Sequence, residues 1–181
     1  VGFGGVWVGA APYLMFIPDR NGDDVPDAEL EILLDGWDPY RDTHETLNTF
    51  SWGPDGWLYG CHGVFCPSLV GKPGTPAKDR QRVDAAIWRY HPTRHDFEVF
   101  AEGTSNPWGL DFNARGHAFI EACVIPHFWH IIQGARYQRQ GGQHYSISQE
   151  EKQRVQPFLP PNAPDHLHPF IYQDIQTHGD H

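Results

Sequence analysis

The stretch HETLNTFSWGPDGWLYG, residues 44–60, indicates the fold most directly. Aromatic residues flank a Gly-Pro-Asp-Gly segment at 53–56, which predicts two short apolar strands joined by a tight turn. His44 and Asn48 stand just before the first of these strands. Segments of the same shape recur along the chain, so this stretch predicts both an architecture and a candidate site.

A loose internal repeat becomes visible when the glycines of the turns are aligned. The aligned segments are Gly5–Val8, Gly56–Tyr59 and Gly116–Phe119, at intervals of 51 and 60 residues. Further hairpins are expected from Tyr13–Ile17 with Leu30–Leu33, and from Ile87–Tyr90 with Phe97–Phe100. Four short strands per unit of about 40–50 residues are typical of propeller blades. The alternative is an unrelated β-sandwich with ordinary hairpins.

We therefore expect an all-β chain whose residues 1–145 form about three blades of a β-propeller. Three blades are too few to close a ring, so we expect a fragment of a longer protein, in keeping with a first residue that is not Met. Cys66–Asp84 is expected to be a long loop. Residues 146–169 are expected to be a proline-rich insert with a short helix, opened by a capping box at Ser148–Glu151. Residues 170–181 are expected to begin a further blade.

Composition excludes several classes of protein. The net charge is −10 and no cluster of Lys or Arg is visible, which argues against nucleic acid as a partner. The sequence contains no run of eighteen apolar residues, so it predicts no transmembrane helix. Glycine-rich phosphate loops, a nucleophile elbow and a HExxH helix are absent, which argues against kinases, dinucleotide enzymes, α/β-hydrolases and common metalloproteases.

The three cysteines do not define a disulfide framework. Cys61 and Cys66 are close enough in sequence to form a local bridge, whereas Cys123 would remain single. Neither a CxxC pair nor the haem-attaching CxxCH motif occurs. Buried free thiols are the simpler interpretation.

An acidic segment at 19–27 predicts a calcium site. Asp19, Asn21, Asp23 and Asp27 place side-chain oxygens at positions 1, 3, 5 and 9 of a loop, which is the spacing of an EF-hand-like turn. The match is partial, because Leu30 stands where a bidentate Glu belongs. The alternative is an acidic hairpin turn, since Asp, Asn and Gly are common turn residues.

Three further sites are candidates for chemistry. His44 lies between carboxylates that would orient its imidazole as a general base, although a single His is also a common surface residue. Asn106 precedes Pro107 at a turn, where its amide would bind a ligand or cap the turn. His127 and His130 are spaced as zinc ligands on one helix face, with aromatic packing as the alternative.

Seven motifs together resemble a known family: Gly5–Leu14, the acidic segment 19–27, Asp42–Thr46, Trp52–Gly60, Ile87–Pro92, Phe97–Leu110 and His130–Ala135. They look like the propeller of the predicted membrane-bound dehydrogenases, which are large bacterial proteins with a PVC-type haem-binding CxxCH domain. The resemblance covers nearly all of Gly5–His144 and returns more loosely at Tyr172–Thr177.

The chain is more distantly similar to the glucose/sorbosone dehydrogenases, which are six-bladed propellers that hold pyrroloquinoline quinone. In that family a His shortly before a Gly-Pro-Asp turn takes the proton of the substrate hydroxyl, and His44 occupies a comparable place. An Arg-Asn-Pro-x-Gly motif of that family binds the quinone. This chain keeps Asn106 but has Ser105 in place of the Arg, which removes a bidentate cation from the quinone site.

The resemblance thus implies part of a six-bladed, TolB-like propeller in a membrane-bound dehydrogenase that oxidises a sugar or polyol. His44 would be the base, Asn48 and Asn106 would position substrate or cofactor, and Asp19–Asp27 would bind calcium. Electrons would pass to a quinone or to haem c in a domain outside this sequence. The location implied is the periplasm or cell surface, with membrane association through missing parts. The alternative is a non-catalytic, calcium-stabilised propeller that binds a carbohydrate or protein partner.

Overall fold

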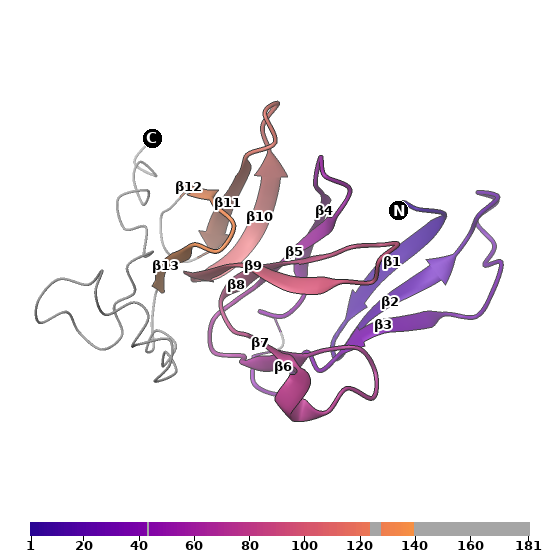
Figure 1. Ribbon diagram of the computed structural model, residues 1–181, viewed down its shortest axis with the longest axis horizontal. Coiled ribbons are helices and arrows are strands. Elements are labelled where there is room, and N and C mark those ends of the chain that lie inside the picture. The colour runs from indigo at the N-terminus through magenta and orange to yellow at the C-terminus, as the bar shows by residue number, and fades with distance from the viewer. Residues whose placement is uncertain (43, 124–127, 140–181) are drawn as a thin grey trace, which may run out of the picture.

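The computed structural model describes residues 1–42, 44–123 and 128–139, and within them the chain is all-β, as predicted (Figure 1). The strands form four separate sheets, none of which closes on itself. A single turn of 3₁₀ helix, η1 (Ala77–Asp79), is the one helical element in these residues. No helix in the described part of the chain is long and apolar enough to cross a bilayer.

The central sheet contains the stretch that predicted the fold. Its strands, in spatial order, are β13 (Arg136–Arg139), β9 (Phe97–Thr104), β8 (Ala86–Tyr90), β5 (Leu58–His62) and β4 (Asn48–Trp52). The run from β4 to β9 is an antiparallel meander, whereas β13 pairs with β9 in parallel. Both predicted hairpins of this sheet are therefore confirmed.

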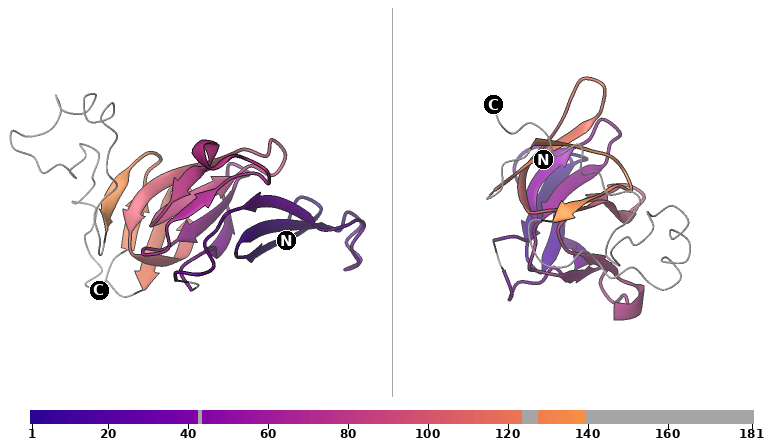
Figure 2. Two further views of the ribbon diagram at one scale, coloured as in Figure 1. Left: turned by 90° about the horizontal axis from the view of Figure 1, so that it is seen from below. Right: turned by 90° about the vertical axis from the view of Figure 1, so that its left-hand side faces the viewer.

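One three-stranded sheet lies on each side of the central sheet (Figures 1 and 2). The first consists of β1 (Gly5–Ala10), β2 (Tyr13–Pro18) and β3 (Glu31–Asp35). The second consists of β10 (Asn106–Phe112), β11 (Ala118–Cys123) and β12 (Phe128–Ile131). All neighbouring strands in these two sheets are antiparallel.

The prediction that Cys66–Asp84 is a loop is wrong for part of its length. Strands β6 (Ser68–Val70) and β7 (Gln81–Val83) pair into a two-stranded sheet, with η1 between them. Val70 and Val83 are fully buried and pack this segment against the core. The Gly-Pro-rich residues between the two strands make this packing hard to predict from the sequence. The short helix expected at 148–155 and the strand expected at 170–177 lie outside the described residues.

Backbone hydrogen bonds and the Asp55 side chain stabilise the Gly-Pro-Asp-Gly turn. Gly56 has a φ of +80°, a left-handed conformation that favours glycine, and its N–H donates to the carbonyl of Gly53 at 3.0 Å. Asp55 accepts a hydrogen bond of 2.8 Å from the hydroxyl of Tyr59 and forms an ion pair with Arg89 at 3.1 Å. The turn thus follows from local geometry and does not require a functional explanation.

Two hydrophobic cores occupy the two faces of the central sheet. Alternation along β8 shows this division, because Ile87 points into the core shared with β10, β11 and β12, whereas Trp88 and Tyr90 point into the other core. That second core contains Leu14 and Leu34 of the first flanking sheet. Burial on both faces explains why β5 is entirely apolar or small except for His62.

A column of stacked rings lies across β11 and β12. Phe128 stacks on Phe119, Phe119 on His130 and His130 on His117, with ring centroids 5.0 to 5.3 Å apart. Burial lowers the pKa of His130, and the positive charge that His117 carries when protonated lowers it further. His127 lies outside the described residues, so the predicted zinc pair stays a prediction.

This column predicts a pH dependence of stability. The unfolded chain protonates His130 near pH 6.5, whereas the folded protein does so only at lower pH. The contribution of His130 to the free energy of unfolding should therefore be complete above about pH 6.5 and decrease as pH drops below that value. Urea unfolding of the wild type and of His130→Gln at about pH 7.5 and about pH 5.5 isolates this contribution: between these pH values the wild type should lose more stability, or gain less, than the variant. An equal pH response in the variant would contradict this assignment.

Candidate functional site

The acidic segment Asp19–Asp27 forms an exposed turn between β2 and β3. Its side-chain oxygens accept backbone N–H groups: Asp19 Oδ1 accepts from Gly22 at 2.8 Å, and Asp23 Oδ1 accepts from Val25 at 2.9 Å. Asn21 and Asp27 also accept backbone N–H groups within the segment. These contacts are those of an acidic turn, and the calcium site stays a prediction.

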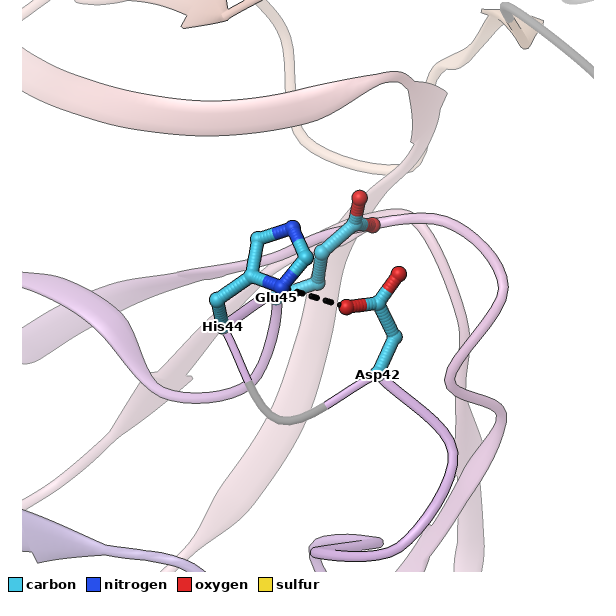
Figure 3. A group of neighbouring side chains, drawn as sticks. All are labelled: Asp42, His44 and Glu45. Carbon is cyan, nitrogen blue, oxygen red and sulfur yellow. Dashed lines mark ion pairs between the residues drawn. The ribbon is translucent and has the colours of Figure 1, made fainter.

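His44 lies in the loop between β3 and β4 and forms a pair with Asp42 (Figure 3). Its Nδ1 is 2.6 Å from Asp42 Oδ1. The His44 side chain is 71% exposed, whereas that of Asp42 is 26% exposed. A carboxylate at Nδ1 fixes the ring and leaves Nε2 as the atom that can take up a proton from a ligand.

Glu45 is the residue that sequence reasoning missed. It is only 7% exposed, and its Oε2 has no hydrogen-bond partner among the described residues. Desolvation, followed by the negative charge of Asp42, raises the pKa of Glu45 from 4.5 to about 7. No pattern in the sequence distinguishes it from a surface acid, because its burial depends on Gly63, which is distant in sequence.

Gly63 makes room for the Glu45 carboxyl group. A Cβ atom on Gly63 would lie 2.4 Å from Glu45 Oε2 and 3.0 Å from Asn106 Oδ1. The Gly63 N–H also donates to the backbone carbonyl of Glu45 at 2.7 Å. The carboxyl group of Glu45 and the amide of Asn106 therefore converge over one glycine.

Asn48 and Asn106, predicted separately, meet in the structure. They begin β4 and β10, on two different sheets, and are 3% and 4% exposed. The Nδ2 of Asn48 lies 2.7 Å from Asn106 Oδ1. With the Asn48 amide turned over, its nitrogen donates instead to the carbonyl of His44 at 3.3 Å. In either orientation Asn48 lies between the His44 loop and Asn106.

The surroundings of Ser105 do not fit the carboxylates of pyrroloquinoline quinone. Ser105 is fully buried, and its hydroxyl donates to the carbonyl of Cys123 at 3.3 Å. A short hydroxyl turned toward the backbone cannot replace the charge or the reach of an arginine. No reaction step is therefore assigned to a bound quinone at this position.

Cys66 and His62 form a second contact of reactive residue types, but this contact is structural. Cys61 and Cys66 are buried free thiols, whereas Cys123 is an exposed free thiol. The Cys66 sulfur lies 3.6 Å from His62 Nδ1, and burial raises the pKa of the thiol. A thiol that resists ionisation is a poor nucleophile, so this pair is not a candidate nucleophilic site.

A separate apolar pocket of about 420 Å³ lies on the sheet formed by β10, β11 and β12. Phe119 and Phe128 form one part of its wall, and Asp111, Asn113 and Glu121 add polar groups. Its size and mixed lining are suited to a small ligand. None of the predicted site residues lines it.

The chain matches one family model over almost its whole length. The family is described as "Domain of unknown function (DUF7133)", and the match covers residues 2–177. A search of the curated proteins finds no match. Because the family description assigns no activity, the site geometry is the basis for a functional conclusion.

Proposed function

The chain belongs to the DUF7133 family, and we propose that it is the propeller part of a membrane-bound dehydrogenase that oxidises a sugar or polyol hydroxyl. The observation that carries this proposal is the Asp42–His44 pair, whose exposed imidazole adjoins the buried contact between Asn48 and Asn106. An oriented imidazole next to rigid polar side chains is what abstraction of a hydroxyl proton requires.

The propeller in this proposal consists of the three large sheets as about three consecutive blades of a six-bladed ring. Two features support it: the antiparallel meander from β4 to β9, and the packing of a further sheet on each of its faces (Figures 1 and 2). In a propeller, the loops at one end of neighbouring blades meet around the central channel. The convergence of the β4 and β10 ends, through Asn48 and Asn106, is consistent with this arrangement.

The proposed chemistry assigns the proton to His44. The Nδ1–H of the neutral imidazole donates to Asp42 Oδ1, so Nε2 accepts the proton of the substrate hydroxyl. Forming the carbonyl would also require a two-electron acceptor for the C–H hydride. A bound quinone would supply that chemistry, and haem c would then take the electrons onward one at a time. Asp42 stabilises the imidazolium that results.

Asn48 and Asn106 act as positioning residues in this proposal. Both side chains are buried and hydrogen-bonded to each other. In this proposal they support the His44 loop and do not contact the substrate. The resemblance to the dehydrogenases adds three further elements: a calcium ion at Asp19, Asn21, Asp23 and Asp27, a haem c domain elsewhere in the protein, and a periplasmic or cell-surface location. No nucleic acid is expected as a partner.

The alternative function is a calcium-stabilised propeller that binds a carbohydrate or a protein without catalysis. The pocket beside Phe119 and Phe128 favours this alternative, because its aromatic wall and nearby polar groups suit the stacking of a sugar ring. A binding module would not need the oriented Asp42–His44 pair.

Dye-linked oxidation distinguishes the two functions. The intact protein is mixed with a panel of aldoses and polyols and an artificial electron acceptor, and dye reduction is followed. The dehydrogenase proposal predicts reduction with at least one substrate. Sugar binding without any reduction would support the binding module instead.

A further inference from the structure

We propose that Asp42, His44 and Glu45 together bind one divalent transition-metal ion, of the class represented by Zn²⁺. The three side chains offer one imidazole nitrogen and two carboxylate oxygens, and one ligand atom from each lies within 4.8 Å of the others (Figure 3). Three protein ligands with an open fourth position are the usual arrangement of a zinc site that retains a water molecule. This inference stands independently of the dehydrogenase proposal.

The strongest support is the unpartnered oxygen of Glu45. Glu45 is only 7% exposed, and its Oε2 makes no hydrogen bond to any described residue. A buried carboxylate is stable only when it is paired, hydrogen-bonded or bound to a metal. Asp42 places a second carboxylate in the same group of ligand atoms, so a cation is a suitable partner for the Glu45 oxygen.

The backbone holds two of the three ligands close together. The Glu45 N–H donates to the carbonyl of Asp42 at 3.1 Å, and the Gly63 N–H donates to the carbonyl of Glu45 at 2.7 Å. In a tetrahedral zinc site the ligand atoms lie about 3.4 Å apart. Separations of up to 4.8 Å must therefore shorten, whereas His44 Nδ1 and Asp42 Oδ1, which are 2.6 Å apart, must separate if both bind the ion. The exposed side chain of His44 has the freedom to make this movement.

The ligand types separate this site from the acidic segment at 19–27. The acidic segment offers only oxygen ligands, which suit Ca²⁺. An imidazole together with carboxylates suits Zn²⁺ and its neighbours in the first transition row. The two sites should therefore respond to different ions and to different substitutions.

Metal binding has one consequence that does rest on the proposed function. An ion held between His44 and Asp42 replaces the hydrogen bond that orients the imidazole. Added Zn²⁺ should then inhibit sugar oxidation, whereas Ca²⁺ should not. If Zn²⁺ binds but does not inhibit oxidation, the role of His44 in the dehydrogenase proposal is contradicted. Metal binding itself is measured directly, so the inference of a metal site does not depend on this result.

The test is a titration of the chelator-treated intact protein with Zn²⁺ by calorimetry, and with Co²⁺ by visible absorption. We expect Glu45→Gln and His44→Ala each to weaken the strongest site by at least about 10-fold. Glu31→Gln, at an exposed acid, and Asp23→Asn, in the acidic segment, should leave that site unchanged. The histidines near the C-terminus are present in every variant, so their binding is common to all of them.

Two results would overturn the inference. The first is an affinity for Zn²⁺ that changes less than about 2-fold in both ligand variants. The second is a loss of binding confined to Asp23→Asn. Asp42→Asn provides a further ligand variant if Glu45→Gln impairs folding, and thermal unfolding of each variant without metal identifies that case.

Discussion

Replacing His44 with alanine is expected to lower kcat/KM for sugar or polyol oxidation by roughly 10²–10⁴-fold. The imidazole is the proposed acceptor of the hydroxyl proton, and Asp42 Oδ1 at 2.6 Å from its Nδ1 keeps the opposite nitrogen available. The side chain is 71% exposed, so its removal should cost little stability. Dye reduction at saturating and limiting substrate separates the loss in kcat from any change in KM.

His117→Ala is the matched control for this prediction. His117 is also exposed but lies in the ring column next to β11, where no proposed step occurs. Asp42→Asn should lower kcat as well, because the pair then loses the charge that stabilises the imidazolium. Full activity in His44→Ala would remove this residue from the mechanism.

Replacing Trp88 with alanine is expected to reduce the free energy of unfolding by about 3–5 kcal/mol. Trp88 is fully buried, and its indole ring packs against Trp37 at 5.1 Å and Phe50 at 5.7 Å between ring centroids. Gly60, its cross-strand neighbour, has no Cβ, and an added Cβ would lie 2.1 Å from the indole. Gly60 therefore has no side chain that could fill the space that the ring leaves.

Urea unfolding of the wild type and of the variant measures this loss. Trp108→Ala is the control, because that ring is 46% exposed and its removal should change stability by less than about 0.5 kcal/mol. A typical domain is stable by about 5–15 kcal/mol, so Trp88→Ala should remove a large share of the stability. Equal effects of the two substitutions would contradict the described core.

Hairpins whose strands and turn have characteristic residues could be predicted from the sequence. The segment from Asn48 to Tyr59 has aromatic strands and a glycine turn, and its two strands form as expected. The pairing of β6 with β7 was not predictable, because the two strands are short and separated by a Gly-Pro-rich segment. The parallel pairing of β13 with β9 was not predictable either, because parallel strands are not joined by a short local turn and their pairing depends on long-range packing.

The candidate site shows the same limit. His44, Asn48 and Asn106 were predicted from local motifs and from the family resemblance, and the structure brings Asn48 and Asn106 into contact. Glu45 was not singled out, because the property that matters is its burial over Gly63. Burial of a polar side chain is set by tertiary packing, which a single sequence without strong periodicity does not reveal.

The most direct test of the proposed function is the modification of histidines by diethyl pyrocarbonate, with and without sugar, followed by mass spectrometry. The dehydrogenase proposal predicts rapid modification of exposed His44 and its protection by an aldose or polyol that binds over the imidazole. Exposed His117 should react equally in both conditions, and fully buried His62 should remain unmodified. If no sugar in the panel slows the modification of His44, substrate does not bind at this residue and the proposal is contradicted.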